Sequence, residues 1–87
     1  MLEFTEFCAV KDGKACCGGT ADIVHSVCDY IKIGEDGKLA YKVKGYEEDS
    51  RMSFSGDCSR IEMQLAAIQY IWGKLEQYGF TIYTRKI

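Results

Sequence analysis

Apolar and polar residues alternate along the start of the chain, which is typical of a β-strand. Four apolar residues share one face of residues 2–10, and they are Leu2, Phe4, Cys8 and Val10. Glu6 lies on the same face. The Asp12-Gly13 pair that follows is a strong hairpin signal, because a two-residue turn needs residues that tolerate positive φ. We therefore expect a first strand over residues 2–10 that ends in a tight turn.

The pattern of residues 21–31 fits two structures. As a strand it would place alternate apolar residues on opposite faces. As a helix it would be capped by Thr20 and present an apolar stripe of Val24, Val27, Cys28 and Ile31. The segment is rich in β-branched residues, which favour the strand. It also runs into a predicted hairpin whose second strand, residues 38–43, places Leu39, Tyr41 and Val43 inward.

A long amphipathic helix is predicted from Ser59 onward. Ser59 and Glu62 have the spacing of a capping box, in which each side chain accepts a hydrogen bond from the backbone of the other. Apolar residues then recur at helical spacing, and they are Ile61, Leu65, Ile68, Trp72 and Leu75. Gly79 stands where a helix C-terminal cap belongs. Residues 80–83 read as a final strand.

These elements predict one α+β domain over residues 1–87. We expect a three-stranded antiparallel meander, one long amphipathic helix and a last strand that lies parallel to the first. The parallel placement follows from the right-handed crossover rule. If residues 21–30 are helical instead, the order becomes βαββαβ, which is the order of a ferredoxin-like sandwich.

Three segments resemble the first half of a ribonuclease H domain. Residues 4–7 read Phe-Thr-Glu-Phe, where that family has Tyr-Thr-Asp-Gly. Residues 59–68 read Ser-Arg-Ile-Glu-Met-Gln-Leu-Ala-Ala-Ile and resemble the family helix Asn-Arg-Met-Glu-Leu-Met-Ala-Ala-Ile, with one residue more. Residues 83–86 read Tyr-Thr-Arg-Lys, where the family has Tyr-Thr-Asp-Ser.

The resemblance implies two-metal phosphodiester hydrolysis, in which several carboxylates hold Mg²⁺ or Mn²⁺. Glu6 and Glu62 would supply carboxylates, with Asp57 as a third acid. Arg85 stands where a third metal ligand is expected, which predicts a degenerate, non-catalytic scaffold. The residues alone support a simpler interpretation, in which Glu62 caps the helix. Glu6 would then form an ion pair with Arg85 or Lys86, provided that the first and last strands are neighbours.

Charge and cysteine content narrow the function classes. The net charge of −2 argues against a general nucleic-acid coat, which would be strongly basic. The N-terminal residues lack the pattern of a signal peptide, and no run is long and apolar enough for a membrane span. The five cysteines show no metal-binding spacing. We expect a cytoplasmic protein with free thiols in a reducing compartment.

The leading hypothesis is a small non-catalytic module that binds a protein partner, such as an inhibitor encoded by a phage or mobile element. Six residues are candidates for the contact because they combine acidic charge with aromatic area, and they are Tyr46, Glu47, Glu48, Asp49, Tyr70 and Tyr78. No cofactor or membrane is expected, and nucleic acid is the less favoured partner because of the acidic charge balance. Homodimerisation through an edge strand fits the predicted half-sheet. The alternative is a metal-dependent nuclease that is active as a dimer.

Overall fold

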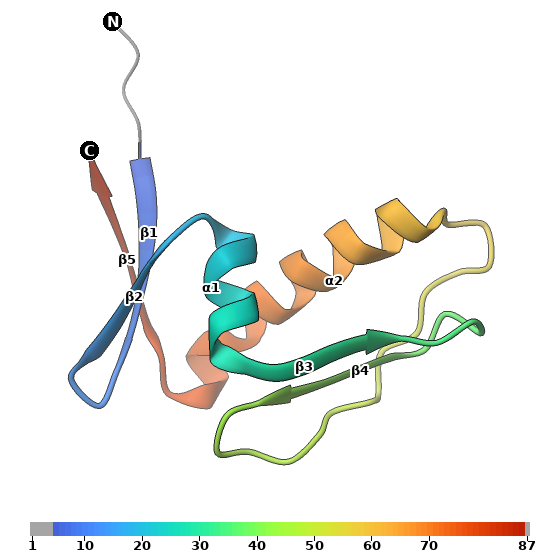
Figure 1. The fold of residues 1–87 in the computed structure, drawn as a ribbon, viewed down its shortest axis with the longest axis horizontal. Helices are drawn as coiled ribbons and strands as arrows, with labels where there is room; N and C mark the ends of the chain where they lie inside the picture. The colour runs from blue at the N-terminus through green and yellow to red at the C-terminus, as the bar shows by residue number, and fades with distance from the viewer. Residues whose placement is uncertain (1–4, 87) are drawn as a thin grey trace, which may run out of the picture.

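The computed structural model describes residues 5–86 and shows an α+β fold with two antiparallel sheets (Figure 1). The part of the first strand predicted over residues 2–4 lies outside the described residues. The elements of the described part are β1 (Thr5–Lys11), β2 (Lys14–Gly18), α1 (Thr20–Val27), β3 (Cys28–Ile33), β4 (Leu39–Val43), α2 (Arg60–Lys74), the short 3₁₀-helix η1 (Leu75–Tyr78) and β5 (Thr81–Lys86). The prediction of an α+β fold with one long helix is confirmed.

The first sheet has the strand order β2-β1-β5. Lys11 and Lys14 close the β1–β2 hairpin across Asp12 and Gly13. Both turn residues have positive φ, 53° and 77°, as the Asp-Gly signal predicts. Among residues 5–86, β1 is the central strand of this sheet, and β2 and β5 form its two edges.

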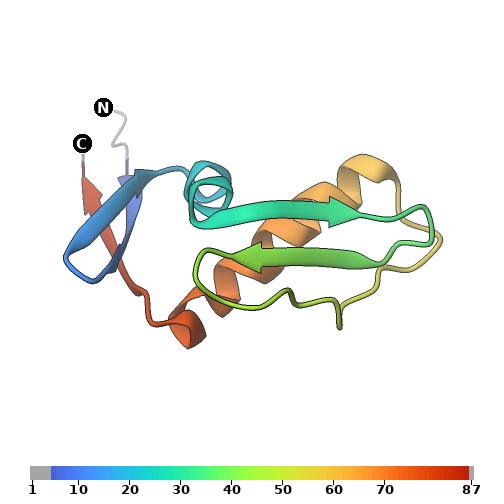
Figure 2. The same ribbon diagram turned by 60° about the horizontal axis from the view of Figure 1, so that its bottom comes forward.

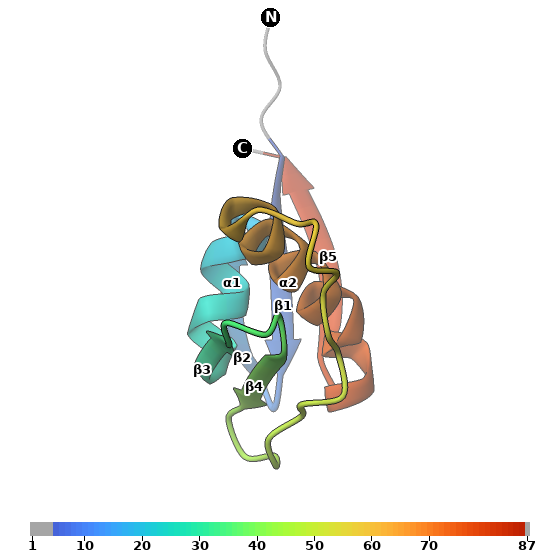
Figure 3. The ribbon, with the colours of Figure 1, turned by 90° about the vertical axis from the view of Figure 1, so that its right-hand side faces the viewer.

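The second sheet is the β3–β4 hairpin, and α2 runs alongside this hairpin (Figures 2 and 3). Helix α1 packs against both the first sheet and α2. Leu39, Tyr41 and Val43 point into the core from β4 and are at most 1 % exposed, as their alternation predicts. The core is completed by small and branched residues of the other elements, and these are Ala9, Ile23, Val24, Val27, Cys28, Ala67, Ile71 and Leu75.

The strand favoured for residues 21–31 is wrong over its first part. Residues 20–27 form α1, and the strand begins only at Cys28. Ile23, Val24 and Val27 are buried along one side of this helix. Packing of that side against the core therefore outweighs the strand propensity of the β-branched residues. The additional strand lies earlier, in β2, for which no strand was predicted.

The last strand is antiparallel to the first, not parallel as predicted. The crossover rule concerns two consecutive strands of one sheet. Here α2 follows β4, which belongs to the second sheet, so the rule does not apply to the connection into β5. The three-stranded meander is likewise replaced by two hairpins in different sheets. The alternative βαββαβ order gives the right position for α1 but lacks β2, and its single sheet is not formed.

Helix α2 begins with the predicted capping box. Ser59 Oγ accepts from the Glu62 amide at 3.2 Å, and a Glu62 carboxylate oxygen accepts from the Ser59 amide at 3.3 Å. The buried face differs from the predicted stripe, because Ile61 is 70 % exposed and Leu65 is 61 % exposed. None of the helices in residues 5–86 is long and apolar enough to cross a membrane.

A disulfide joins Cys8 of β1 to Cys17 of β2, which are paired across the two strands. The prediction of free thiols is therefore wrong for these two residues, whereas Cys16, Cys28 and Cys58 are free. The sequence pattern missed the bond because it placed no strand at Cys17, and only the β1–β2 pairing brings the two sulfurs together. Since disulfides persist in oxidising surroundings, the bond weighs against a reducing compartment.

We predict that reduction lowers the free energy of unfolding by about 2–3 kcal/mol, because the bond closes a short loop in the unfolded chain. Urea unfolding with and without dithiothreitol measures the difference. A variant with both Cys8→Ala and Cys17→Ala should be insensitive to the reductant. Equal stability of the oxidised and reduced wild-type chains would contradict the assignment.

Candidate protein-binding surface

The segment after β4 folds back and is held against that strand by backbone hydrogen bonds. The amide of Asp49 donates to the carbonyl of Tyr41 at 2.9 Å, and the amide of Tyr41 donates to the carbonyl of Asp49 at 3.0 Å. The reversal begins at Gly45, whose φ of 86° suits glycine. The backbone of residues 45–49 is therefore fixed at both ends.

Asp49 is a buried, internally paired residue. It is only 8 % exposed, and its carboxylate accepts from the Arg51 side chain at 2.7 Å and from the Arg51 amide at 3.0 Å. The Tyr41 hydroxyl lies 3.4 Å from the same carboxylate. The hydrogen bonds from Arg51 lower the pKa of Asp49 from 3.8 to about 2. Asp49 therefore stabilises the loop rather than presenting charge.

Four tyrosines from different parts of the chain pack together, and we call them the tyrosine cluster: Tyr41, Tyr46, Tyr70 and Tyr78. The Tyr41 ring meets Tyr70 and Tyr78 edge-on, with centroid distances of 6.2 and 6.4 Å. Tyr46 meets Tyr78 at 5.0 Å, and its hydroxyl donates to the Tyr78 carbonyl at 2.8 Å. The cluster therefore ties β4 and the following loop to α2 and η1.

Burial fixes the protonation state of the central tyrosine. Loss of solvent around the Tyr41 hydroxyl raises its pKa above the ordinary range, and the hydrogen bond with the Tyr78 hydroxyl, 3.2 Å away, adds to this effect. Tyr41 is therefore a neutral phenol that can donate to the Asp49 carboxylate.

Glu47 and Glu48 carry the free acidic charge of the loop. Both are exposed, and neither belongs to any of the three ion pairs found among the described residues. The Tyr30 hydroxyl donates to Glu48, and this bond raises the pKa of Tyr30. Because Asp49 and Arg51 neutralise each other, the loop presents the two glutamates as its net charge.

A shallow groove of about 470 Å³ collects most of the predicted contact residues. Its lining, which we call the acidic groove, consists of Tyr46, Glu47, Glu48, Asp49, Ser50, Arg51 and Tyr78. Tyr70 is the one predicted contact residue outside this lining, and it packs against Tyr41 instead. Arg51 was not among the predicted contact residues, although a basic residue two positions after Asp49 is the signal of such a local pair.

The structure does not bring the three predicted metal ligands together. Glu6 accepts a hydrogen bond from Arg85 and forms an ion pair with it across the paired strands. Glu62 caps α2 at the other end of the molecule, and Asp57 lies in the preceding loop (Figure 1). Within residues 5–86, Glu6 lies close to Cys8 and Cys17, and side chains of these three types could in principle hold a metal ion. The sulfurs of Cys8 and Cys17 are bonded to each other in the disulfide, however, and are therefore not free thiolate ligands.

Comparisons with protein-family models, curated proteins and solved structures find no match to this chain. The ribonuclease H resemblance therefore gains no support from them.

We predict that the free energy of unfolding decreases at acidic pH because Asp49 becomes protonated. Its pKa is lower in the folded chain than its ordinary value, so its contribution is present above about pH 4 and is lost as the pH falls toward 2. The loss should be about 1 kcal/mol, because the Arg51 partner is solvent-exposed and screened. Urea unfolding across this range tests it.

The control for this titration is Asp49→Asn, which keeps the shape of the side chain and removes the ionisable group. The difference in unfolding free energy between wild type and variant should shrink as the pH is lowered. A constant difference would show that Asp49 is not paired as described.

Proposed function

We propose that this chain is a non-catalytic module that binds a protein partner, and that the acidic groove takes a basic segment of that partner. The observation that carries the proposal is the unneutralised charge of Glu47 and Glu48 beside the exposed aromatic edge of Tyr46. Carboxylates attract Lys and Arg, and a tyrosine ring supplies rigid contact area to the apolar stems of those side chains.

The fixed backbone of the groove favours binding. Ordering a flexible loop on association opposes affinity, whereas this loop is already held by Asp49 and by the two hydrogen bonds to Tyr41. Tyr46 and Tyr78 are likewise held against each other. The partner therefore meets a preformed surface.

Association of two copies of the chain is the competing mode of binding. The strands β2 and β5 each have one neighbour within the described sheet, so edge pairing between two copies is the form of homodimer that the sequence led us to expect. This mode would use the sheet edge and leave the acidic groove open. The two modes can therefore be separated by experiment.

We predict that a capped peptide of alternating Arg and Gly binds the acidic groove. Titration followed by amide resonances should shift residues 46–51 and Tyr78, and a matched Glu-Gly peptide should shift none of them. Changing Glu47→Gln and Glu48→Gln together should weaken binding about tenfold, because two surface charge contacts are lost. Added salt should weaken it further.

The matched control changes Glu35→Gln and Asp57→Asn, two exposed acids outside the groove, and alters the net charge by the same amount. Equal weakening by both double variants would refute the proposal, because it would indicate attraction by overall charge. Light scattering of the free protein checks its mass. If the free protein is a dimer that dissociates in the Glu47→Gln, Glu48→Gln variant, the acidic groove binds a second copy of the chain and not a different partner. That result would also refute the proposal.

A further inference from the structure

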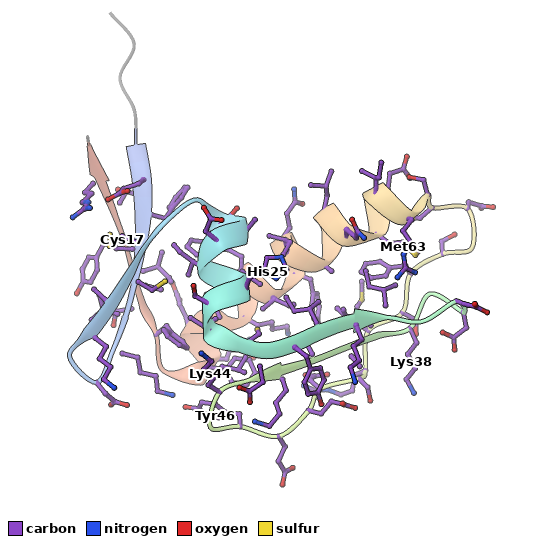
Figure 4. The ribbon with its side chains drawn as sticks, viewed as in Figure 1. Cys17, His25, Lys38, Lys44, Tyr46 and Met63 are labelled. Carbon is purple, nitrogen blue, oxygen red and sulfur yellow. A yellow bond between two sulfur atoms is a disulfide. The ribbon has the colours of Figure 1, made fainter. Side chains whose placement is uncertain are left out.

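A second cleft lies on the other side of Tyr46. It has a volume of about 650 Å³, within the range of small-molecule sites, and is bounded by the β1–β2 hairpin, the C-terminal end of α1 and residues 44–46. We call it the lysine cleft. Its lining consists of Ala9, Lys11, Asp12, Lys14, Ala15, Cys16, Ser26, Val27, Lys44, Gly45, Tyr46 and Phe80. Figure 4 shows Lys44 and Tyr46 at this end of the molecule.

The charge of the lysine cleft is opposite to that of the acidic groove. Lys11, Lys14 and Lys44 contribute three ammonium groups against the single carboxylate of Asp12. Lys14 and Lys44 are exposed, and none of the three lysines belongs to an ion pair among the described residues. The cleft therefore carries a net positive charge that is available to an anion.

Lys11 is held in place at the wall of the cleft. Its ammonium donates to the Tyr46 hydroxyl and lies 4.1 Å from the centre of the Tyr46 ring and 5.4 Å from that of Phe80. These contacts fix the position of one positive charge between two aromatic rings. A ligand at this wall would meet a fixed cation and a flat apolar surface together.

The floor and sides of the cleft are largely apolar. Ala9 is 1 % exposed and Val27 is 7 % exposed, and Ala15 and Phe80 complete the apolar lining. The carbonyl of Val27 at the end of α1 already accepts from the Lys44 amide at 2.9 Å. Because this carbonyl is already paired, the polar groups offered to a ligand are mainly the charged lysine side chains. The apolar remainder of the lining suits the apolar part of an organic molecule.

We propose that the lysine cleft binds a small organic anion with a flat apolar body. The anionic group would lie among Lys11, Lys14 and Lys44, and the body would lie against Ala9, Val27 and Phe80. This site uses a different surface from the acidic groove and does not depend on the proposed partner. Success or failure of either proposal leaves the other open to its own test.

A free thiol in the lining of the cleft allows ligand binding to be measured by alkylation. Cys16 is a free, half-buried thiol in its lining, and Cys58 is a free thiol of similar exposure before α2, outside the cleft. A ligand in the cleft should shield Cys16 from iodoacetamide and leave Cys58 unaffected. Mass spectrometry of the two peptides from one sample gives both rates.

The experiment uses the oxidised protein and two probes, anilinonaphthalene sulfonate and phenylnaphthylamine, which has the same rings without the sulfonate. The sulfonate should bind one per chain and slow Cys16 alkylation about tenfold at ten times its dissociation constant. Changing Lys14→Ala and Lys44→Ala together should weaken the sulfonate about tenfold and leave phenylnaphthylamine unchanged.

The matched control changes Lys32→Ala and Lys38→Ala, two exposed lysines outside the cleft. Circular dichroism shows whether each variant keeps the wild-type fold, and only folded variants are compared. Three results would overturn the proposal: equal weakening by both lysine pairs, unprotected Cys16 at saturation, or equal effects of the lysine changes on the two probes.

Discussion

The buried ring of Tyr41 joins the elements on which the candidate surface depends. It is 1 % exposed and contacts Tyr70 of α2, Tyr78 of η1 and the carboxylate of Asp49. A phenol in this position needs a partner for its hydroxyl, and the loop after β4 supplies one. The same residue therefore fills the core and fixes the loop that carries Glu47 and Glu48.

Tyr46 separates two surfaces of opposite charge. One side of it lines the acidic groove, and the other lines the lysine cleft. Its hydroxyl donates to the Tyr78 carbonyl and accepts from Lys11, so the wall between the two sites is tied to η1 and to β1. Both proposals consequently rest on the same structural element while using different chemistry.

The elements that the sequence predicts best are those with local signals. Asp12-Gly13 specifies its turn, the Ser59–Glu62 pair specifies the start of α2, and the alternation of β4 correctly predicts its inward residues. The structure of residues 20–27 is predicted wrongly from local signals, because their β-branched residues favour a strand, whereas packing against the rest of the fold makes them a helix. The antiparallel direction of β5 depends on which sheet β4 joins, and no local sequence pattern indicates which sheet this is.

In the candidate site, too, the features that depend on local sequence could be predicted and those that depend on tertiary packing could not. Tyr46 and the acidic residues 47–49 could be selected from composition, and Tyr78 joins them in the acidic groove. The burial of Asp49 could not, because it depends on Tyr41 and Arg51 closing around its carboxylate. The lysine cleft was missed entirely, since Lys44 lies beside the hairpin of Lys11 and Lys14 only after β4 and the first sheet are placed.

The most direct test of a preformed groove is amide hydrogen exchange in residues 41–49. We expect the Asp49 amide, which donates to the Tyr41 carbonyl, to exchange as slowly as the paired amides of β4. The amides of Glu47 and Glu48, which donate no backbone hydrogen bond among the described residues, should exchange rapidly. Equally rapid exchange at Asp49 would show that the loop is not held against β4, and would contradict the account.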